Sequence, residues 1–128
     1  MRPDPSWESS GVETAINTFE TLADELTISV WGGDWCKDCQ EQLPAFAAAL
    51  QTAGIDPEET RHFPVEKNDD GSKDGPLVEK YDITLIPTIV VERDGTEIAR
   101  FVESAANPAI VELAEQLSLS TNAAQRHH

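Results

Sequence analysis

The chain has 128 residues, enough for one domain with a sizeable hydrophobic core. It carries 24 acidic residues against 9 lysines and arginines, which gives a formal net charge of −15. Such a surface repels nucleic acid and anionic membranes, so we expect neither as a partner. No apolar run approaches membrane-spanning length, and the first residues do not read as a secretory signal.

The acidic excess can be interpreted in two ways. A high net charge is typical of disordered chains, but here apolar residues recur with helix and strand periods along most of the sequence. We therefore expect a folded, halophilic protein, in which salt screens self-repulsion and acidic residues keep the chain soluble. The scarcity of lysine agrees with this interpretation; the lysines are Lys37, Lys67, Lys73 and Lys80.

The N-terminal third predicts an arm, a helix and a strand. Residues 1–10 contain two prolines and no period, so we interpret them as an arm whose Trp7 can dock on the domain. Ser10-Gly11-Val12-Glu13 has the pattern of a capping box and starts an amphipathic helix. Its apolar face is Val12, Ala15, Ile16, Phe19, Leu22, Ala23 and Leu26. Residues 26–31 then alternate as a strand does, and Gly32-Gly33 ends it.

A second helix is predicted from Cys36 to about Thr52. Its buried face is expected to be Leu43, Phe46, Ala47 and Leu50. Pro44 lies inside this helix, where it removes one hydrogen bond and should produce a kink. Ala53-Gly54 is expected to end the helix.

The middle of the chain gives weaker signals. Residues 61–66 predict a short strand, although Pro64 has no N–H to donate to a β-ladder. Residues 67–75 predict a polar loop; a calcium-binding loop is disfavoured because Lys80 stands where its last glutamate should be. Residues 76–81 predict a short helix with proline at its first position.

The C-terminal part predicts a hairpin and a last helix. Thr88-Ile89-Val90-Val91 is a continuous apolar run, typical of a central strand buried on both faces. Glu92-Arg93-Asp94-Gly95 predicts a hairpin turn that leads to an antiparallel strand over residues 98–102. Asn107-Pro108 starts the last helix, and residues 119–128 predict a frayed tail. The inner face of that helix is Ile110, Leu113, Ala114 and Leu117.

Both cysteines belong to the segment Cys36-Lys37-Asp38-Cys39, which follows the first strand and opens the second helix. Two thiols three positions apart on the first turn of a helix lie close enough to form a disulfide and to release it again. Unpaired N–H groups and partial positive charge at a helix N-terminus favour a thiolate at the first position. We therefore expect Cys36 to be the nucleophile and Cys39 the resolving thiol, with no organic cofactor and no metal.

Two other roles for the cysteine pair stay open. A structural zinc site needs four protein ligands, and here it would have to recruit His62 and a carboxylate or one of the terminal histidines, His127 and His128. A permanent disulfide closes a loop too short to constrain much of the unfolded chain. Redox chemistry is favoured over both. A redox-active cysteine pair without a secretory signal suggests that the protein works in the reducing cytoplasm. The alternative is a secreted protein whose signal has been removed, so that the sequence begins at the mature end.

Three features, in the right order, resemble the thioredoxin superfamily. Trp35-Cys36-Lys37-Asp38-Cys39 resembles its WCxxC active site, and Ile86-Pro87-Thr88 is similar to its IPT segment, in which the proline is cis. Pro44 falls where the family has a helix-kinking proline. The resemblance covers about residues 11–118.

This resemblance implies an α/β thioredoxin-like fold, with a central mixed β-sheet of about four strands and helices on both faces. The chain then divides into an arm (1–10), a thioredoxin-like domain (11–118) and a flexible tail (119–128). The first strand of the family is optional, and it has no clear counterpart here unless residues 6–9 supply it.

The resemblance also implies a thiol–disulfide oxidoreductase that acts on protein disulfides. Trp35 would shield the thiols and offer an apolar rim, while the Ile86-Pro87 segment would place the backbone of Ile86 beside the cysteine pair, where it pairs with an extended substrate. We expect a monomeric, cytoplasmic reductant supplied by an unidentified electron donor. The alternative is a binding or redox-regulatory module on the same fold, without turnover.

The resemblance is incomplete at four places. Val30 stands where thioredoxins proper have a buried aspartate that assists proton transfer from the resolving thiol, and Gly32 replaces the family's second tryptophan. Glu103 aligns with a glycine that borders the substrate groove, and Lys37-Asp38 replaces Gly-Pro. These differences predict a thioredoxin-like protein rather than a housekeeping thioredoxin.

Overall fold

A computed structural model describes most of the chain. The described residues are 11–33, 37–57, 60–67, 73–75, 77–103 and 107–125, with the backbone alone at 37–38, 67, 73–74 and 119–125. The predicted arm (1–10) therefore lies outside the described residues, and so do Trp35 and Cys36.

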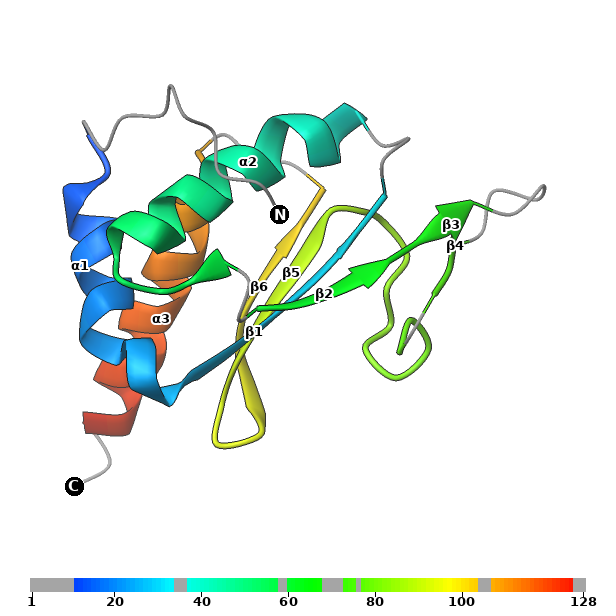
Figure 1. Cartoon of the computed structure of the whole chain (residues 1–128). Helices are drawn as coiled ribbons and strands as arrows, with labels where there is room; N and C mark the ends of the chain where they lie inside the picture. Colours follow the sequence, from blue (N-terminus) through cyan, green and yellow to red (C-terminus); the bar gives the residue numbers. More distant parts are fainter. Residues whose placement is uncertain are drawn as a thin grey trace.

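A four-stranded mixed sheet, in the order β2-β1-β5-β6, forms the centre of the fold (Figure 1). Strand β1 runs parallel to β2 and antiparallel to β5, and β5 runs antiparallel to β6. The elements are α1 (Glu13–Leu22), a 3₁₀ turn (Ala23–Glu25), β1 (Leu26–Gly32), α2 (Lys37–Thr52), β2 (Arg61–Pro64), β3 (Glu66–Lys67), β4 (Lys73–Asp74), β5 (Thr88–Arg93), β6 (Thr96–Val102) and α3 (Ala109–Gln125). This architecture confirms the predicted α/β fold class.

The two faces of β1 carry different side chains because successive residues of a strand point to opposite sides. Val30 and Gly32 share one face, and Gly32 lies directly against side chains of α2. Trp31 points to the other face, where its ring lies 5.0 Å from Phe63 and 5.0 Å from Tyr81, measured between centroids. Strand β1 is therefore packed on both faces, against α2 on one face and against Phe63 and Tyr81 on the other.

The helices form a connected layer. Phe19 of α1 meets Phe46 of α2 edge to face, with ring centroids 6.4 Å apart. Helices α1 and α3 lie side by side, and α3 also lies along β6 (Figure 1). Gln116 of α3 accepts a hydrogen bond from the backbone N–H of Arg100 (2.8 Å) and donates one to its carbonyl (2.9 Å), which satisfies backbone groups on an edge strand. Within the described part of the chain, no helix is both long and apolar enough to cross a membrane.

Several predicted elements are confirmed. Helix α2 contains Pro44 and buries its predicted face, Leu43, Phe46, Ala47 and Leu50. It ends at Gly54, whose φ of 82° allows the N–H of Ile55 to bond back to the Leu50 carbonyl at 2.9 Å. The hairpin between β5 and β6 turns at Asp94 and Gly95, which both have positive φ, as a two-residue turn of this kind requires.

The start of α1 differs from the prediction. The helix begins at Glu13, and its N-cap is Val12, which makes no side-chain hydrogen bond to the helix. Gly11 has a φ of 86°, so this residue is not helical. The capping box predicted from Ser10 to Glu13 is therefore wrong: it would need Glu13 one turn into the helix.

Three further segments differ from the sequence expectations. A helix was predicted over residues 76–81, but the described part of this segment, residues 77–81, is a series of hydrogen-bonded turns, since Leu77 has a φ of 60° and breaks the helical conformation. The polar segment 67–75 contributes strand residues: β3 and β4 pair antiparallel, with Glu66 opposite Asp74. Helix α3 continues to Gln125, past the boundary expected at residue 119.

Candidate functional site

Cys39 lies in the first turn of α2, and 5% of it is exposed. Its sulfur packs against the end of β1: a Cβ added to Gly32 would lie 3.3 Å from Cys39 Sγ and 3.0 Å from Leu43 Cδ1. Gly32 thus leaves the space that the buried thiol and a leucine of α2 occupy. A larger residue at position 32 would have to displace one of them.

Val30 lies on the same face of β1 as Gly32, two residues earlier, and it is fully buried. It stands between His62 of β2 and Ile89 of β5 in the strand register. In the described part of the chain, the buried polar side chains are Ser29 and Thr88. Among these residues, therefore, no carboxylate is buried near the Cys39 thiol.

The Ile86–Pro87 peptide bond is cis, as the resemblance implies, and both residues are buried. Trp31 pairs with Thr88 in the antiparallel register, so the next residues, Gly32 and Pro87, lie opposite one another. Gly32 is also the residue whose lack of a Cβ leaves space for the Cys39 sulfur. The buried thiol and the cis prolyl bond consequently meet at the same end of β1.

Two hydrogen bonds hold the segment around the cis bond. The Thr88 hydroxyl donates to the Leu85 carbonyl at 2.6 Å, across the prolyl bond. The backbone N–H of Glu103 donates to the Pro87 carbonyl at 2.7 Å and extends the β5–β6 ladder by one step. This end of the sheet is therefore ordered by contacts from both the preceding loop and β6.

A polar network on the other face of the sheet fixes the turns that lead to this segment. Tyr81 donates to Glu92 at 2.9 Å, and Arg61 donates to Glu92 at 3.1 Å and to the hydroxyl of the buried Ser29 at 2.9 Å. Tyr81 also packs on Trp31. This network was not predicted, because its members are far apart in the sequence and share no motif.

Of the five predicted site residues, the structure brings Cys39, Ile86 and Pro87 to one end of the sheet. Cys36 and Trp35 lie outside the described residues. The sequence interpretation missed the two large apolar side chains beside the prolyl segment, Leu85 and Val102, which are 44% and 38% exposed. Leu85 could have been found because it directly precedes Ile86-Pro87 in the sequence, but the exposure of its side chain cannot be predicted from sequence.

A metal centre was one of the two other roles considered for the cysteine pair. Within the residues that the structure describes, no three histidines, cysteines, aspartates or glutamates gather in a group that could hold a metal ion. His62, the histidine considered as a zinc ligand, lies on β2 with an exposed side chain.

Comparison with known proteins finds similarity in structure alone. No protein-family model matches the chain, and no curated protein matches it in sequence. Among solved structures, thioredoxin 1 from the thermophilic eubacterium Thermosipho africanus TCF52B superposes with a TM-score of 0.52 over 77% of this chain and 98% of that chain, at 20% identity. The fold is thioredoxin-like.

Other similar structures are also thioredoxins or related proteins. Trxlp from Edwardsiella tarda EIB202 is 15% identical, with a TM-score of 0.48 over 91% of this chain and 96% of that chain. Thioredoxin f2 from Chlamydomonas reinhardtii is 19% identical, with a TM-score of 0.45 over 86% of this chain and 92% of that chain. The fold assignment rests on the superposition with the Thermosipho africanus thioredoxin, and at 20% identity the chemistry has to be argued from the site.

Proposed function

We propose that the protein is a thiol–disulfide oxidoreductase that reduces protein disulfides through Cys36 and Cys39. The observation that carries this proposal is the buried Cys39 thiol, placed against Gly32 at the end of β1 and opposite the cis Ile86–Pro87 bond. A buried thiol one turn into a helix suits a resolving role, since it stays protected until a mixed disulfide forms beside it. Cys36 precedes it by three residues in the sequence.

The reaction would proceed in two exchanges. The Cys36 thiolate attacks one sulfur of the substrate disulfide, the substrate S–S bond breaks, and a mixed disulfide forms as the other substrate sulfur leaves as a thiolate. The Cys39 thiol then loses its proton and attacks Cys36 Sγ, which releases the second substrate thiol. Two electrons and two protons pass to the substrate, and the protein is left with a Cys36–Cys39 disulfide. A thiol-based electron donor restores the dithiol, so no organic cofactor is required.

The substrate would lie beside the cysteine pair as an extended segment. Ile86 would pair with it through the backbone, Pro87 would leave room for it because proline has no N–H, and Trp35 would supply an apolar rim. The positive end of α2 supports the thiolate of Cys36. These roles rest on the resemblance of the two motifs and agree with the positions of Ile86 and Pro87 beside Gly32.

The valine at position 30 affects the second exchange. Because no carboxylate of the described residues is buried near Cys39, its proton would pass to solvent or to the departing substrate thiolate. We expect resolution to be slow relative to attack, and the mixed disulfide to be correspondingly long-lived. The protein would still turn over, since solvent or the departing substrate thiolate can accept the Cys39 proton in each cycle.

The test uses a protein disulfide substrate, dithiothreitol as the reductant and three variants of the full chain. Cys36→Ser should abolish turnover, whereas Cys39→Ser should accumulate a mixed disulfide that mass spectrometry detects; the double variant is the control for background reduction. Turnover that survives Cys36→Ser, or that is absent from the native protein, would overturn the proposal and leave a binding module. The reduction potential of the pair decides the direction: about −270 mV indicates a reductant and about −120 mV an oxidant.

A further inference from the structure

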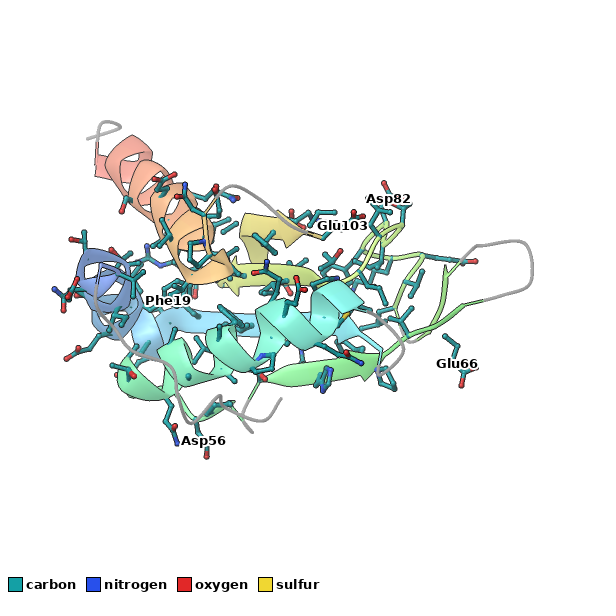
Figure 2. The ribbon with its side chains drawn as sticks, turned by 90° about the horizontal axis from the view of Figure 1, so that it is seen from above. Phe19, Asp56, Glu66, Asp82 and Glu103 are labelled. Carbon is teal, nitrogen blue, oxygen red and sulfur yellow. The ribbon has the colours of Figure 1, made fainter. Side chains whose placement is uncertain are left out.

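Three residues form a row across the end of the sheet, one at the end of each of three neighbouring strands. Gly32 ends β1, Pro87 precedes β5 and lies opposite Gly32, and Glu103 follows β6 and donates its backbone N–H to Pro87. Figure 2 shows Glu103 at the tip of β6, on the side of the molecule where α2 begins. The Glu103 backbone is therefore fixed beside the prolyl segment that the proposed function assigns to substrate binding.

The backbone conformation at position 103 does not favour glutamate over other residues. Its φ is 60°, in the left-handed region that glycine adopts without strain and other residues adopt at a cost of about 1–2 kcal/mol. The residue is partly exposed, and no arginine, lysine or histidine among the described residues forms an ion pair with its carboxylate. Among the described side chains, this carboxylate is thus a negative charge without an ion-pair partner, carried by a fixed backbone.

Two exposed apolar residues lie in the backbone segments next to Glu103. Val102, the preceding residue, lies opposite Thr88 in the register, and Leu85 lies on the other side of the prolyl segment, where its carbonyl bonds to Thr88. Both side chains are among the exposed large hydrophobic residues of the described chain. A segment bound here would meet two apolar side chains and one negative charge.

We propose that Glu103 is a specificity-determining residue that selects substrate segments with a lysine or arginine beside the reacting cysteine. This inference rests on the proposed function, because it names the substrate class of the same site. A cation in the bound segment gains an ion pair with Glu103, while an acidic residue at that position is repelled. The effect acts on binding rather than on the exchange itself, so it should alter KM more than kcat.

Two disulfide-bonded peptides that differ in one residue test the inference. One peptide carries lysine beside the attacked cysteine and the other carries glutamate, and the ratio of their kcat/KM values is measured at low salt. Exposed ion pairs contribute about 0.2–1 kcal/mol, so Glu103→Gln should lower the lysine preference by about 1.4- to five-fold. Glu103→Lys should reverse the preference, and molar salt should remove the difference between the native protein and Glu103→Gln.

The matched control is Glu20→Gln, which removes the same charge from the exposed face of α1. Phe19, the neighbour of Glu20, and Glu103 are well apart in Figure 2. An unchanged ratio in Glu20→Gln and a lowered ratio in Glu103→Gln support local selection. Equal effects of the two variants would show that the net charge alone attracts basic peptides, and an unchanged ratio in folded Glu103→Gln would likewise overturn the inference. If the native protein reduces neither peptide, the proposed function fails and the specificity fails with it.

Discussion

Replacing Gly32 by alanine adds one methyl group where β1 meets α2. The new Cβ would lie 3.0 Å from Leu43 Cδ1 and 3.3 Å from Cys39 Sγ, whereas non-bonded carbon atoms pack best at about 3.5–4.0 Å. Both side chains are buried, so neither can move aside without disturbing the core. Overpacking of this kind costs about 1–3 kcal/mol.

An opposing effect reduces this cost. Gly32 lies outside the left-handed region, so alanine can adopt its backbone conformation. Replacing glycine then restricts the unfolded chain and stabilises the native state by about 0.4–1 kcal/mol. The steric cost is the larger of the two, and we expect Gly32→Ala to lower the free energy of unfolding by about 1 kcal/mol, or the melting temperature by about 4 °C.

The assay is thermal and urea unfolding with both cysteines kept reduced. Gly54→Ala is the control. Gly54 has a φ of 82°, so alanine there is strained by the backbone conformation, while the added Cβ meets nothing within 4 Å. In a Leu43→Val background, which removes Cδ1, the cost of Gly32→Ala should fall by at least about 0.5 kcal/mol, whereas that of Gly54→Ala should not change. The steric argument would be refuted by a Gly32→Ala variant that melts at or above the native melting temperature. It would also be refuted if the double-mutant cycle of Gly32→Ala with Leu43→Val showed no coupling energy.

Three other predictions concern stability. Ser29→Ala removes the acceptor of the Arg61 Nε–H bond and should cost about 1 kcal/mol in urea unfolding, while Thr27→Ala, at an exposed position near the start of β1, serves as the control; equal costs would contradict the role of this bond. Hydrogen bonds from Arg100 hold the pKa of the Glu97 carboxyl below its ordinary value, so their contribution should be present above pH ~4.5 and lost as the pH falls through the lower folded-state pKa. Glu97→Gln should therefore be less stable than the native protein at pH 7, by at most about 1 kcal/mol since the pair is exposed, and a gap that persists at pH 3 would refute this. Removing salt should lower the melting temperature, because a net charge of −15 repels itself when unscreened; an unchanged midpoint between low and molar salt would end the halophile interpretation.

The sequence alone predicted the elements that depend on local rules. The buried face of α2 follows from the spacing of its apolar residues, and the turn at Asp94-Gly95 follows from the ease with which these two residues adopt positive φ. The apolar run from Thr88 to Val91 similarly predicted a central strand, and β5 is buried there on both faces. In each case the signal lies within a few residues of the structure that it predicts.

Where a tertiary contact overrode the local pattern, the sequence prediction failed. The sequence over residues 76–81 carries a helix-start signal, yet residues 77–81 form turns that bring Tyr81 onto Trp31 and into hydrogen bonding with Glu92. The capping box depended on a helical chain before Glu13, and Gly11 departs from that conformation. Pairing of β3 with β4 involves backbone groups, which leave no mark on the side-chain pattern.

For the site, the sequence by itself determined which residues carry the chemistry: two cysteines in one motif, and a proline whose family counterpart is cis. Only the tertiary structure decided that Cys39 packs against Gly32, that Gly32 lies opposite Pro87, and that Glu103 stands beside them. Gly32, Pro87 and Glu103 lie 16 to 71 positions apart in the chain, and strand register brings them together. Register is set by the burial of whole strand faces, a property of the packed sheet that no short stretch of sequence contains.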